Sequence, residues 1–202
     1  ASLLLLGACS SDGYTIRGKI AGLDNPYVYL LRYTGEVEVI DSAKVTKGDF
    51  VFKGKAEQPE VVYLSTDKQQ PFVHFFLENG RISVDGALSA PADIAVLGTP
   101  SNDIQRAFDE KIAALEEEFA KAGNDMQRDS LRKEYSKLMS DAVEMNRDNI
   151  YGVTTFLNNA YAFLSPEEVM EQIALFPAEW QQRRELTELR EATERKLRVS
   201  AG

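Results

Sequence analysis

Residues 72–85, FVHFFLENGRISVD, decide the fold of the N-terminal half of this chain. Residues 72–77 form an apolar run of strand length, which predicts a central strand buried on both faces. The dipeptide Asn79-Gly80 comes next, and it favours the positive φ angles of a two-residue hairpin turn. Because residues 81–85 alternate between polar and apolar side chains, we predict that they pair with residues 72–77 in a β-hairpin.

The sequence around this hairpin has the same strand character. Residues 14–20 (YTIRGKI) alternate cleanly, and residues 47–49 predict a hairpin turn into a further strand at residues 50–54. Residues 61–64 (VVYL) form a second apolar run that is typical of a central strand. Short strands at this spacing, with no helix between them, predict an antiparallel β-sandwich or partly open barrel over residues 14–100.

After Pro100 the apolar period changes from that of a strand to that of a helix. Gly123-Asn124 separates two predicted helices, which we expect to form an antiparallel hairpin. Their apolar stripes are Ile104, Phe108, Ile112, Leu115 and Phe119 on the first helix, and Leu131, Tyr135, Leu138, Ala142 and Met145 on the second. The predicted fold is therefore α+β, with the sandwich followed by a helical segment at residues 101–202.

The rest of that segment contains three more predicted helices. Residues 153–164 give a short apolar helix, and Ser165 begins the next as an N-cap, with Pro166 at its first position and Glu168 closing a capping box. The last helix, at residues 178–198, has few apolar residues among many Glu and Arg side chains. This composition predicts a largely solvated helix that acts as a connector or spacer.

Charge and cysteine count exclude several classes of function. The chain has 202 residues, with 23 Lys and Arg against 32 Asp and Glu, so its net charge is −9. A phosphate backbone or an anionic headgroup layer would repel it on average, so nucleic acid is not an expected partner. Because the chain has one cysteine, it cannot form an intrachain disulfide, a CxxC redox pair or a cysteine-rich metal site.

That cysteine, Cys9, lies in a sequence that resembles a bacterial lipobox, Leu6-Gly7-Ala8-Cys9. Residues 1–8 then form the remnant of a signal peptide, and Cys9 carries the lipid after cleavage. Residues 9–13 become a tether to the membrane, which places the protein in the cell envelope on the periplasmic or cell-surface side. The alternative is a buried apolar strand or helix start with a chance cysteine.

No residue set forms a complete catalytic or metal-binding group, so we predict no enzymatic activity and no cofactor. His74 is the only histidine, and its apolar neighbours favour a hydrogen-bonded structural residue. Asp41-Ser42 and Glu78-Asn79 could orient a ligand, but turn chemistry accounts for both pairs more simply. Four tyrosines leave a small-ligand or glycan-binding module open as a further function: Tyr27, Tyr29, Tyr33 and Tyr63.

Several short motifs resemble a family of bacterial extracytoplasmic domains of unknown function. They are residues 40–43 (IDSA), 48–54 (GDFVFKG), 76–80 (FLENG), and Gly98-Thr99 followed by Asn102-Asp103. The resemblance covers residues 14 to about 110. In many members this domain precedes a thioredoxin-like domain of the alkyl hydroperoxide reductase and thiol-specific antioxidant type. The predicted helical stretch of this chain also resembles the segment that precedes the thioredoxin-like domain in those proteins.

The resemblance leaves two main functions open. The first is a lipid-anchored extracytoplasmic domain with a non-catalytic positioning or binding role. Its expected partners are the membrane, through the lipid anchor, and a C-terminal thioredoxin-like domain or another protein. The second is the accessory N-terminal part of a thiol-disulfide oxidoreductase or peroxiredoxin-like protein. Gly202 lies at about the point where the redox domain begins in such proteins, so none of that domain's cysteines is present in this sequence.

Overall fold

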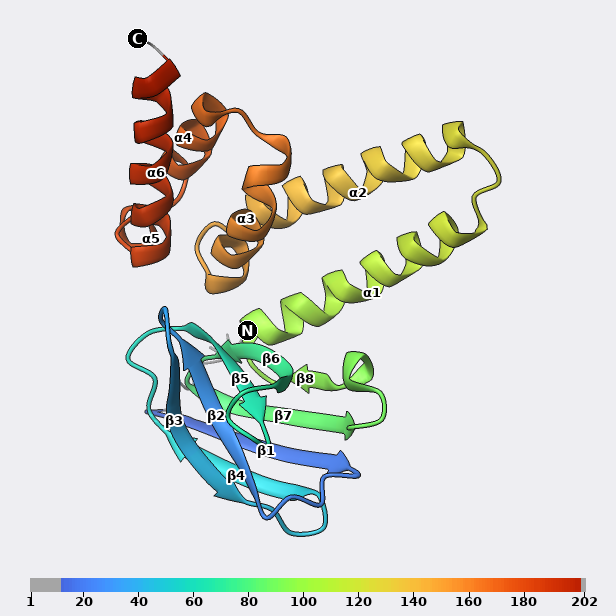
Figure 1. The fold of residues 1–202 in the computed structure, drawn as a ribbon, viewed down its shortest axis with the longest axis vertical. Coiled ribbons are helices and arrows are strands. Elements are labelled where there is room, and N and C mark those ends of the chain that lie inside the picture. The colour runs from blue at the N-terminus through green and yellow to red at the C-terminus, as the bar shows by residue number, and fades with distance from the viewer. Residues whose placement is uncertain (1–11, 201–202) are drawn as a thin grey trace, which may run out of the picture. The chain divides into compact units, whose positions relative to one another are not determined.

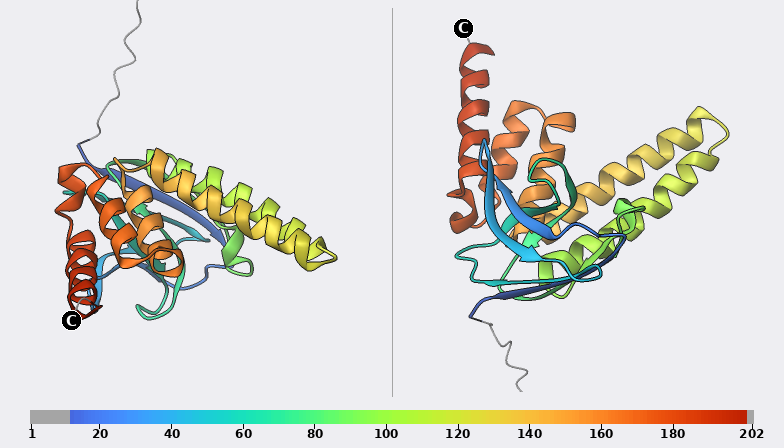
Figure 2. Two further views of the ribbon diagram at one scale, coloured as in Figure 1. Left: turned by 90° about the horizontal axis from the view of Figure 1, so that it is seen from above. Right: turned by 60° about the horizontal axis from the view of Figure 1, so that its bottom comes forward.

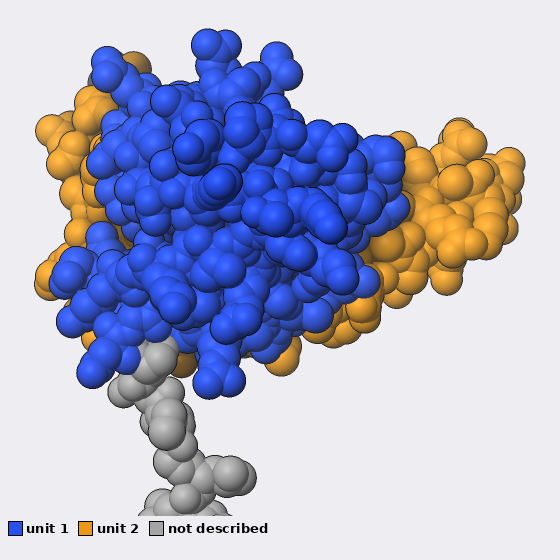
Figure 3. Space-filling model, turned by 90° about the horizontal axis from the view of Figure 1, so that it is seen from below, with its two compact units in different colours: residues 1–106 blue, residues 107–202 orange. Residues whose placement is uncertain are grey.

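The structure, a computed structural model, describes residues 12–200. The chain divides between Arg106 and Ala107 into two compact units, which Figure 3 shows in different colours. The first unit is built of strands and the second of helices, so the predicted α+β class is confirmed.

In the described part of the first unit, eight strands form two four-stranded sheets (Figure 1). Sheet I has the order β4-β1-β7-β8, and sheet II has the order β3-β2-β5-β6. Sheet I is made of β4 (Asp49–Gly54), β1 (Tyr14–Ala21), β7 (Gly80–Ala87) and β8 (Ala95–Leu97). Sheet II is made of β3 (Val37–Lys44), β2 (Tyr27–Tyr33), β5 (Glu60–Ser65) and β6 (Pro71–Leu77). Neighbouring strands are antiparallel except β1 and β7, which run parallel.

The apolar side chains of the alternating strands pack in a single core of this unit. Alternation along β1 buries Ile16 and Ile20 and leaves Arg17 and Lys19 exposed. Gly18 faces the core opposite Phe50 of β4, and the Phe50 ring lies where a β-carbon of residue 18 would be. The larger members of the core are Ile16, Ile20, Leu23, Leu30, Phe50, Phe52, Leu64, Phe75, Leu77 and Ile82.

The predicted hairpin at Asn79-Gly80 is wrong, because β6 and β7 belong to different sheets. Gly80 has a φ angle of +150°, and its N–H donates to the carbonyl of Gly13 at 3.1 Å. The chain therefore leaves sheet II and joins β1 instead of turning back on β6. As a result β6 is an edge strand of sheet II and not the central strand that its apolar run predicts.

A tight turn is confirmed at residues 47–49, but the hairpin predicted around it is wrong, because β3 and β4 belong to different sheets. Thr46 and Asp49 exchange two backbone hydrogen bonds of 2.9 and 3.0 Å around Lys47 and Gly48. The φ angles of Lys47 and Gly48, +52° and +83°, are those of a tight two-residue turn with the right-handed twist of a hairpin. This turn also connects the two sheets, because β3 and β4 lie in different ones.

Within the described residues, six α-helices follow: α1 (Pro100–Lys121), α2 (Asp125–Met145), α3 (Ile150–Phe163), α4 (Pro166–Ala174), α5 (Ala178–Gln181) and α6 (Arg184–Ser200). As predicted, α1 and α2 run in opposite directions, joined at residues 122–124 (Figures 1 and 2). The capping box at Ser165 and Glu168 is confirmed, with both of its hydrogen bonds formed. A second core packs α2, α3, α4 and α6 through Val143, Val153, Phe156, Val169, Ile173, Phe176, Leu186 and Leu189.

Two details of the helical prediction are wrong. Met145 is 74% exposed, because it is the last residue of α2, after which Asn146 ends the helix. The single helix predicted at residues 178–198 is interrupted between Gln181 and Arg184. Leu186 and Leu189 on α6 are buried in the helical core, so this helix packs on its neighbours and is not a solvated spacer.

Candidate functional site

Five polar residues of the sequence motifs, together with Ser101, meet where β6, β7 and the start of α1 come together. We call this set the junction network: Glu78, Asn79, Thr99, Ser101, Asn102 and Asp103. Asn102 is its most buried asparagine, with 2% of its surface exposed. Its Oδ1 accepts the N–H of Phe76 at 2.9 Å, and its Nδ2 donates to the carbonyl of Phe76 at 2.8 Å. Nδ2 also lies 2.7 Å from Oγ1 of Thr99. The amide of Asn102 thus substitutes for a neighbouring strand at the edge of sheet II.

Asn79 makes the same kind of contact with a different segment. Its Oδ1 accepts the N–H of Ala56 at 2.9 Å, and its Nδ2 donates to the carbonyl of Ala56 at 2.8 Å. Ala56 follows β4 and is itself buried. The side chain of Asn79 therefore fixes the connection between β4 and β5, a role that its expected place in a hairpin turn did not suggest.

Glu78 and Asp103 attach the first turn of α1 to the strands. The Glu78 carboxylate accepts the N–H of Ser101 at 3.1 Å and its hydroxyl at 2.6 Å. A carboxylate at this end of a helix also interacts favourably with the helix dipole. Asp103 accepts the N–H of Gly98 at 2.8 Å. These bonds support the structural interpretation of Glu78-Asn79, and they explain why Asn102-Asp103 belongs to the same motif set.

Asp41 and Ser42 also interact locally. Oδ1 of Asp41 accepts the backbone N–H of Ser42 at 2.7 Å. The pair lies on β3, an edge strand, next to a register shift in its pairing with β2. The local bond agrees with the structural interpretation, although the pair is part of a bulged strand and not of a turn.

His74 differs from its prediction, because it is exposed on the edge strand β6. Among residues 12–200 the imidazole makes no hydrogen bond, and its ring contact is with Tyr63, at 6.0 Å between centroids. Tyr63 also meets Tyr33 edge to face at 4.7 Å. Burial raises the pKa of the Tyr63 phenol above its ordinary value, and the neighbouring Tyr33 adds to this shift.

The four tyrosines considered for ligand binding do not form one platform. Tyr33 and Tyr63 contact each other, whereas Tyr29 packs under the ammonium group of Lys68, 4.6 Å from its ring centroid. Tyr27 is 48% exposed at the start of β2. The aromatic surface is therefore limited to a Tyr33–Tyr63–His74 group.

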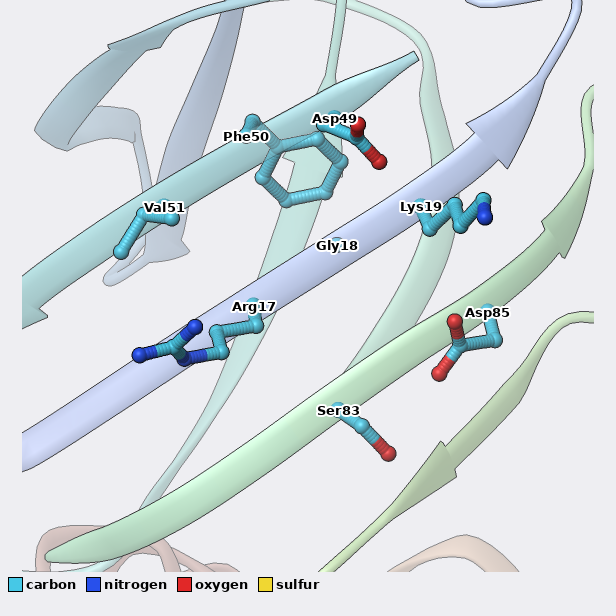
Figure 4. A pocket seen from close by; sticks show the side chains of 8 residues that line it. All are labelled: Arg17, Gly18, Lys19, Asp49, Phe50, Val51, Ser83 and Asp85. Carbon is cyan, nitrogen blue, oxygen red and sulfur yellow. The ribbon is translucent and has the colours of Figure 1, made fainter.

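A shallow hollow of about 380 Å³ lies on the outer face of sheet I (Figure 4). Arg17 and Lys19 of β1 project from its floor, with Ser83 and Asp85 of β7 on one side. Asp49, Phe50 and Val51 of β4 line the other side. This face was not predicted from the sequence, although strand alternation puts each of these polar residues on the outside. The missing information was the pairing of β1 with both β4 and β7.

The described part of the chain contains neither a cluster of metal-binding side chains nor a helix that could cross a membrane. No group of three or more His, Cys, Asp and Glu side chains in residues 12–200 is placed to hold a metal ion. None of the helices in the same range is both long enough and apolar enough to cross a bilayer. Cys9, the predicted lipidation site, lies outside the described residues.

Comparison with known proteins identifies one region. Neither the curated proteins nor the solved structures searched give a match. The sequence model of one family does match, from the first residue of β1 to the first turns of α1, and it therefore includes Glu78, Asn79, Asn102 and Asp103. A DUF4369 domain, described as a domain of unknown function, covers residues 14–105 of this chain.

Proposed function

We propose that this chain is a membrane-anchored extracytoplasmic lipoprotein domain with a non-catalytic positioning role. The observation that supports this function best is the junction network. In it, Glu78 bonds Ser101, and Asn102 bonds both backbone groups of Phe76, so these two side chains fasten the start of α1 to the sandwich. Side chains engaged in this way fix the first turn of α1 on the strands, and such an attachment is what a positioning domain requires.

The proposed anchor is the lipid on Cys9. Each buried CH₂ of an acyl chain contributes roughly 0.8 kcal/mol, so the two or three chains of a mature lipoprotein hold it durably on a bilayer. The apolar run before Cys9 and the small residues Gly7 and Ala8 are the features that support export and cleavage at this point. The polar residues 10–13 then connect the lipid to β1.

A Cys9→Ala variant tests the anchor. We expect the unchanged protein, expressed in a bacterium behind a full signal sequence, to incorporate labelled palmitate and to sediment with membranes. Cys9→Ala should incorporate no label and lose at least about tenfold in membrane association, because the acyl chains supply the binding. Ser10→Ala is the matched control and should behave like the unchanged protein. Equal sedimentation of Cys9→Ala and Ser10→Ala without label would rule out the anchor.

The domain match favours a second candidate function. Residues 14–105 are the same region whose motifs resemble domains that precede a thioredoxin-like domain. The positioning role would then serve a redox domain further along the same polypeptide. The gene sequence after the Gly202 codon tests this: we expect an open frame leading to paired cysteines, and a stop codon would exclude a redox domain in the same chain.

A further inference from the structure

The outer face of sheet I has three of its four positive charges at one end, and the fourth, Lys19, lies further along β1. Thr15, near the start of β1, pairs in register with Lys53 of β4 on one side and with Arg81 of β7 on the other. The next outward residue of β1 is Arg17, which pairs with Val51 and Ser83. Residues placed diagonally on neighbouring strands lie roughly 7–8 Å apart, so the three cations form one cluster. We call Arg17, Lys53 and Arg81 the basic cluster.

The acidic residues of this face lie at its other end. Lys19 pairs in register with Asp49 of β4 and Asp85 of β7, so two carboxylates flank one ammonium group there (Figure 4). A strand rises about 3.3 Å per residue, which places this row roughly 13 Å beyond Thr15 along β1. The face is thus divided into a basic end at the start of β1 and a mixed, partly acidic end further along.

The basic cluster is available to an external anion. Arg17, Lys53 and Arg81 are all exposed, and none of them forms an ion pair or hydrogen bond through its side chain within residues 12–200. By contrast, exposed cations of the helical unit are often paired, as Lys137 is with Asp141 at 2.6 Å. Three unpaired cations on a flat, open sheet face suit a surface of many phosphate groups better than a single enclosed ligand.

The chain itself indicates which surface that is. Tyr14, the first residue of β1, follows Cys9 by five residues, and a chain of five residues spans at most about 18 Å. If Cys9 carries the lipid, as the proposed function requires, the start of β1 stays close to the bilayer. The basic end of sheet I is then the end of that face nearest to the headgroups.

We propose that the basic cluster binds the phosphate groups of anionic lipid headgroups next to the lipid anchor. The net charge of −9 repels such a surface at long range, but this repulsion is screened beyond about 10 Å in 0.1 M salt. The anchor holds the cluster within that distance, where each Lys or Arg is attracted to the anionic leaflet. The lipid therefore provides attachment, and the cluster fixes which face of the sandwich lies on the membrane.

The test uses Cys9 as an attachment point, because it is the only cysteine of the chain. The full chain is coupled through this thiol to a maleimide lipid, in vesicles of phosphatidylcholine alone or with 30% phosphatidylglycerol. Acetylation of Lys53 by a water-soluble reagent is followed by mass spectrometry in 25 mM salt, relative to Lys137, which is 74% exposed on α2. We expect phosphatidylglycerol to slow the modification of Lys53 about fivefold, and 500 mM salt to remove the difference.

Two variants with the same change in net charge distinguish binding by the basic cluster from a general effect of the total charge of the protein. Arg17→Glu with Arg81→Glu should abolish the protection of Lys53. Lys133→Glu with Arg195→Glu, both exposed on helices, should leave it within about twofold of the unchanged protein. Circular dichroism confirms that both variants fold. Equal modification rates of Lys53 on the two vesicles, or equal loss of protection in the two variants, would overturn the proposal. Because the coupling is chemical, the outcome does not depend on whether a cell lipidates Cys9.

Discussion

A Gly18→Ala variant is expected to lower the free energy of unfolding of the sandwich by about 3 kcal/mol, because the added methyl group has no space. A β-carbon on residue 18 would lie 1.9 Å from Cζ of Phe50 and within 2.3 Å of two more ring atoms. Phe50 is 3% exposed and packs edge to face on Phe52, so its ring cannot move aside without leaving the core. The backbone of Gly18 itself has no positive φ angle, so the whole cost is steric.

Denaturant unfolding followed by residue-resolved amide signals of the sandwich measures this effect. Gly123→Ala is the matched control, since the nearest atom to its added β-carbon is Oε1 of Gln127 at 3.8 Å, and it should change stability by less than about 0.5 kcal/mol. In a Phe50→Leu background, where the ring is absent, Gly18→Ala should cost less than about 1 kcal/mol. A cost for Gly18→Ala that is the same in both backgrounds would show that the Phe50 ring is not its cause.

The contact of Gly18 with Phe50 also shows what the sequence alone could and could not predict. Alternation along residues 14–20 correctly predicts a strand with one buried face. It says nothing about which strand lies beside it, because a sheet pairs residues that are far apart in the chain. The parallel pairing of β1 with β7 therefore could not be predicted. The basic cluster depends on this pairing, because Arg17 and Arg81 lie on strands that are neighbours in the sheet but far apart in the sequence.

Short sequence motifs predicted the local structure correctly where the hydrogen-bond partners lie within a few residues in the sequence. The turn at Lys47-Gly48 and the capping box at Ser165 and Glu168 each satisfy backbone groups within a few residues, and both are confirmed. Asn79-Gly80 has an equally strong turn signal, yet its asparagine bonds to Ala56, 23 residues away. Tertiary hydrogen bonds thus replaced the local preference, which explains why the predicted hairpin is wrong.

The residues of the candidate site show the same difference between local and long-range partners. Turn chemistry gave the right general role for Glu78-Asn79, a structural one, but assigned it to the wrong partners. Asn102 was visible only as part of a family motif, because its two bonds to Phe76 join residues that are 26 positions apart. His74 was predicted from its apolar neighbours to be held by hydrogen bonds, and its position on an edge strand left it exposed instead.

An Asn102→Ala variant is expected to lower the free energy of unfolding of the sandwich by about 4 kcal/mol. Leaving a buried backbone donor or acceptor without a partner costs about 1–3 kcal/mol, and this change leaves two such groups on Phe76. The bond to Thr99 is lost as well. Water cannot easily replace the amide, because Asn102 and Phe76 are only 2% and 3% exposed.

Hydrogen exchange at the Phe76 amide gives the most direct measurement, since this N–H donates to Asn102 itself. We expect exchange to become roughly 700-fold faster in Asn102→Ala, as a loss of about 4 kcal/mol implies. Asn124→Ala is the matched control: it removes an exposed N-cap bond at the start of α2, should cost about 1 kcal/mol and should leave the Phe76 amide unchanged. The contrary outcome is a Phe76 amide that is equally protected in Asn102→Ala and in Asn124→Ala. In that case the junction network would not hold the start of α1 to the sandwich, and the positioning role would lose its main support.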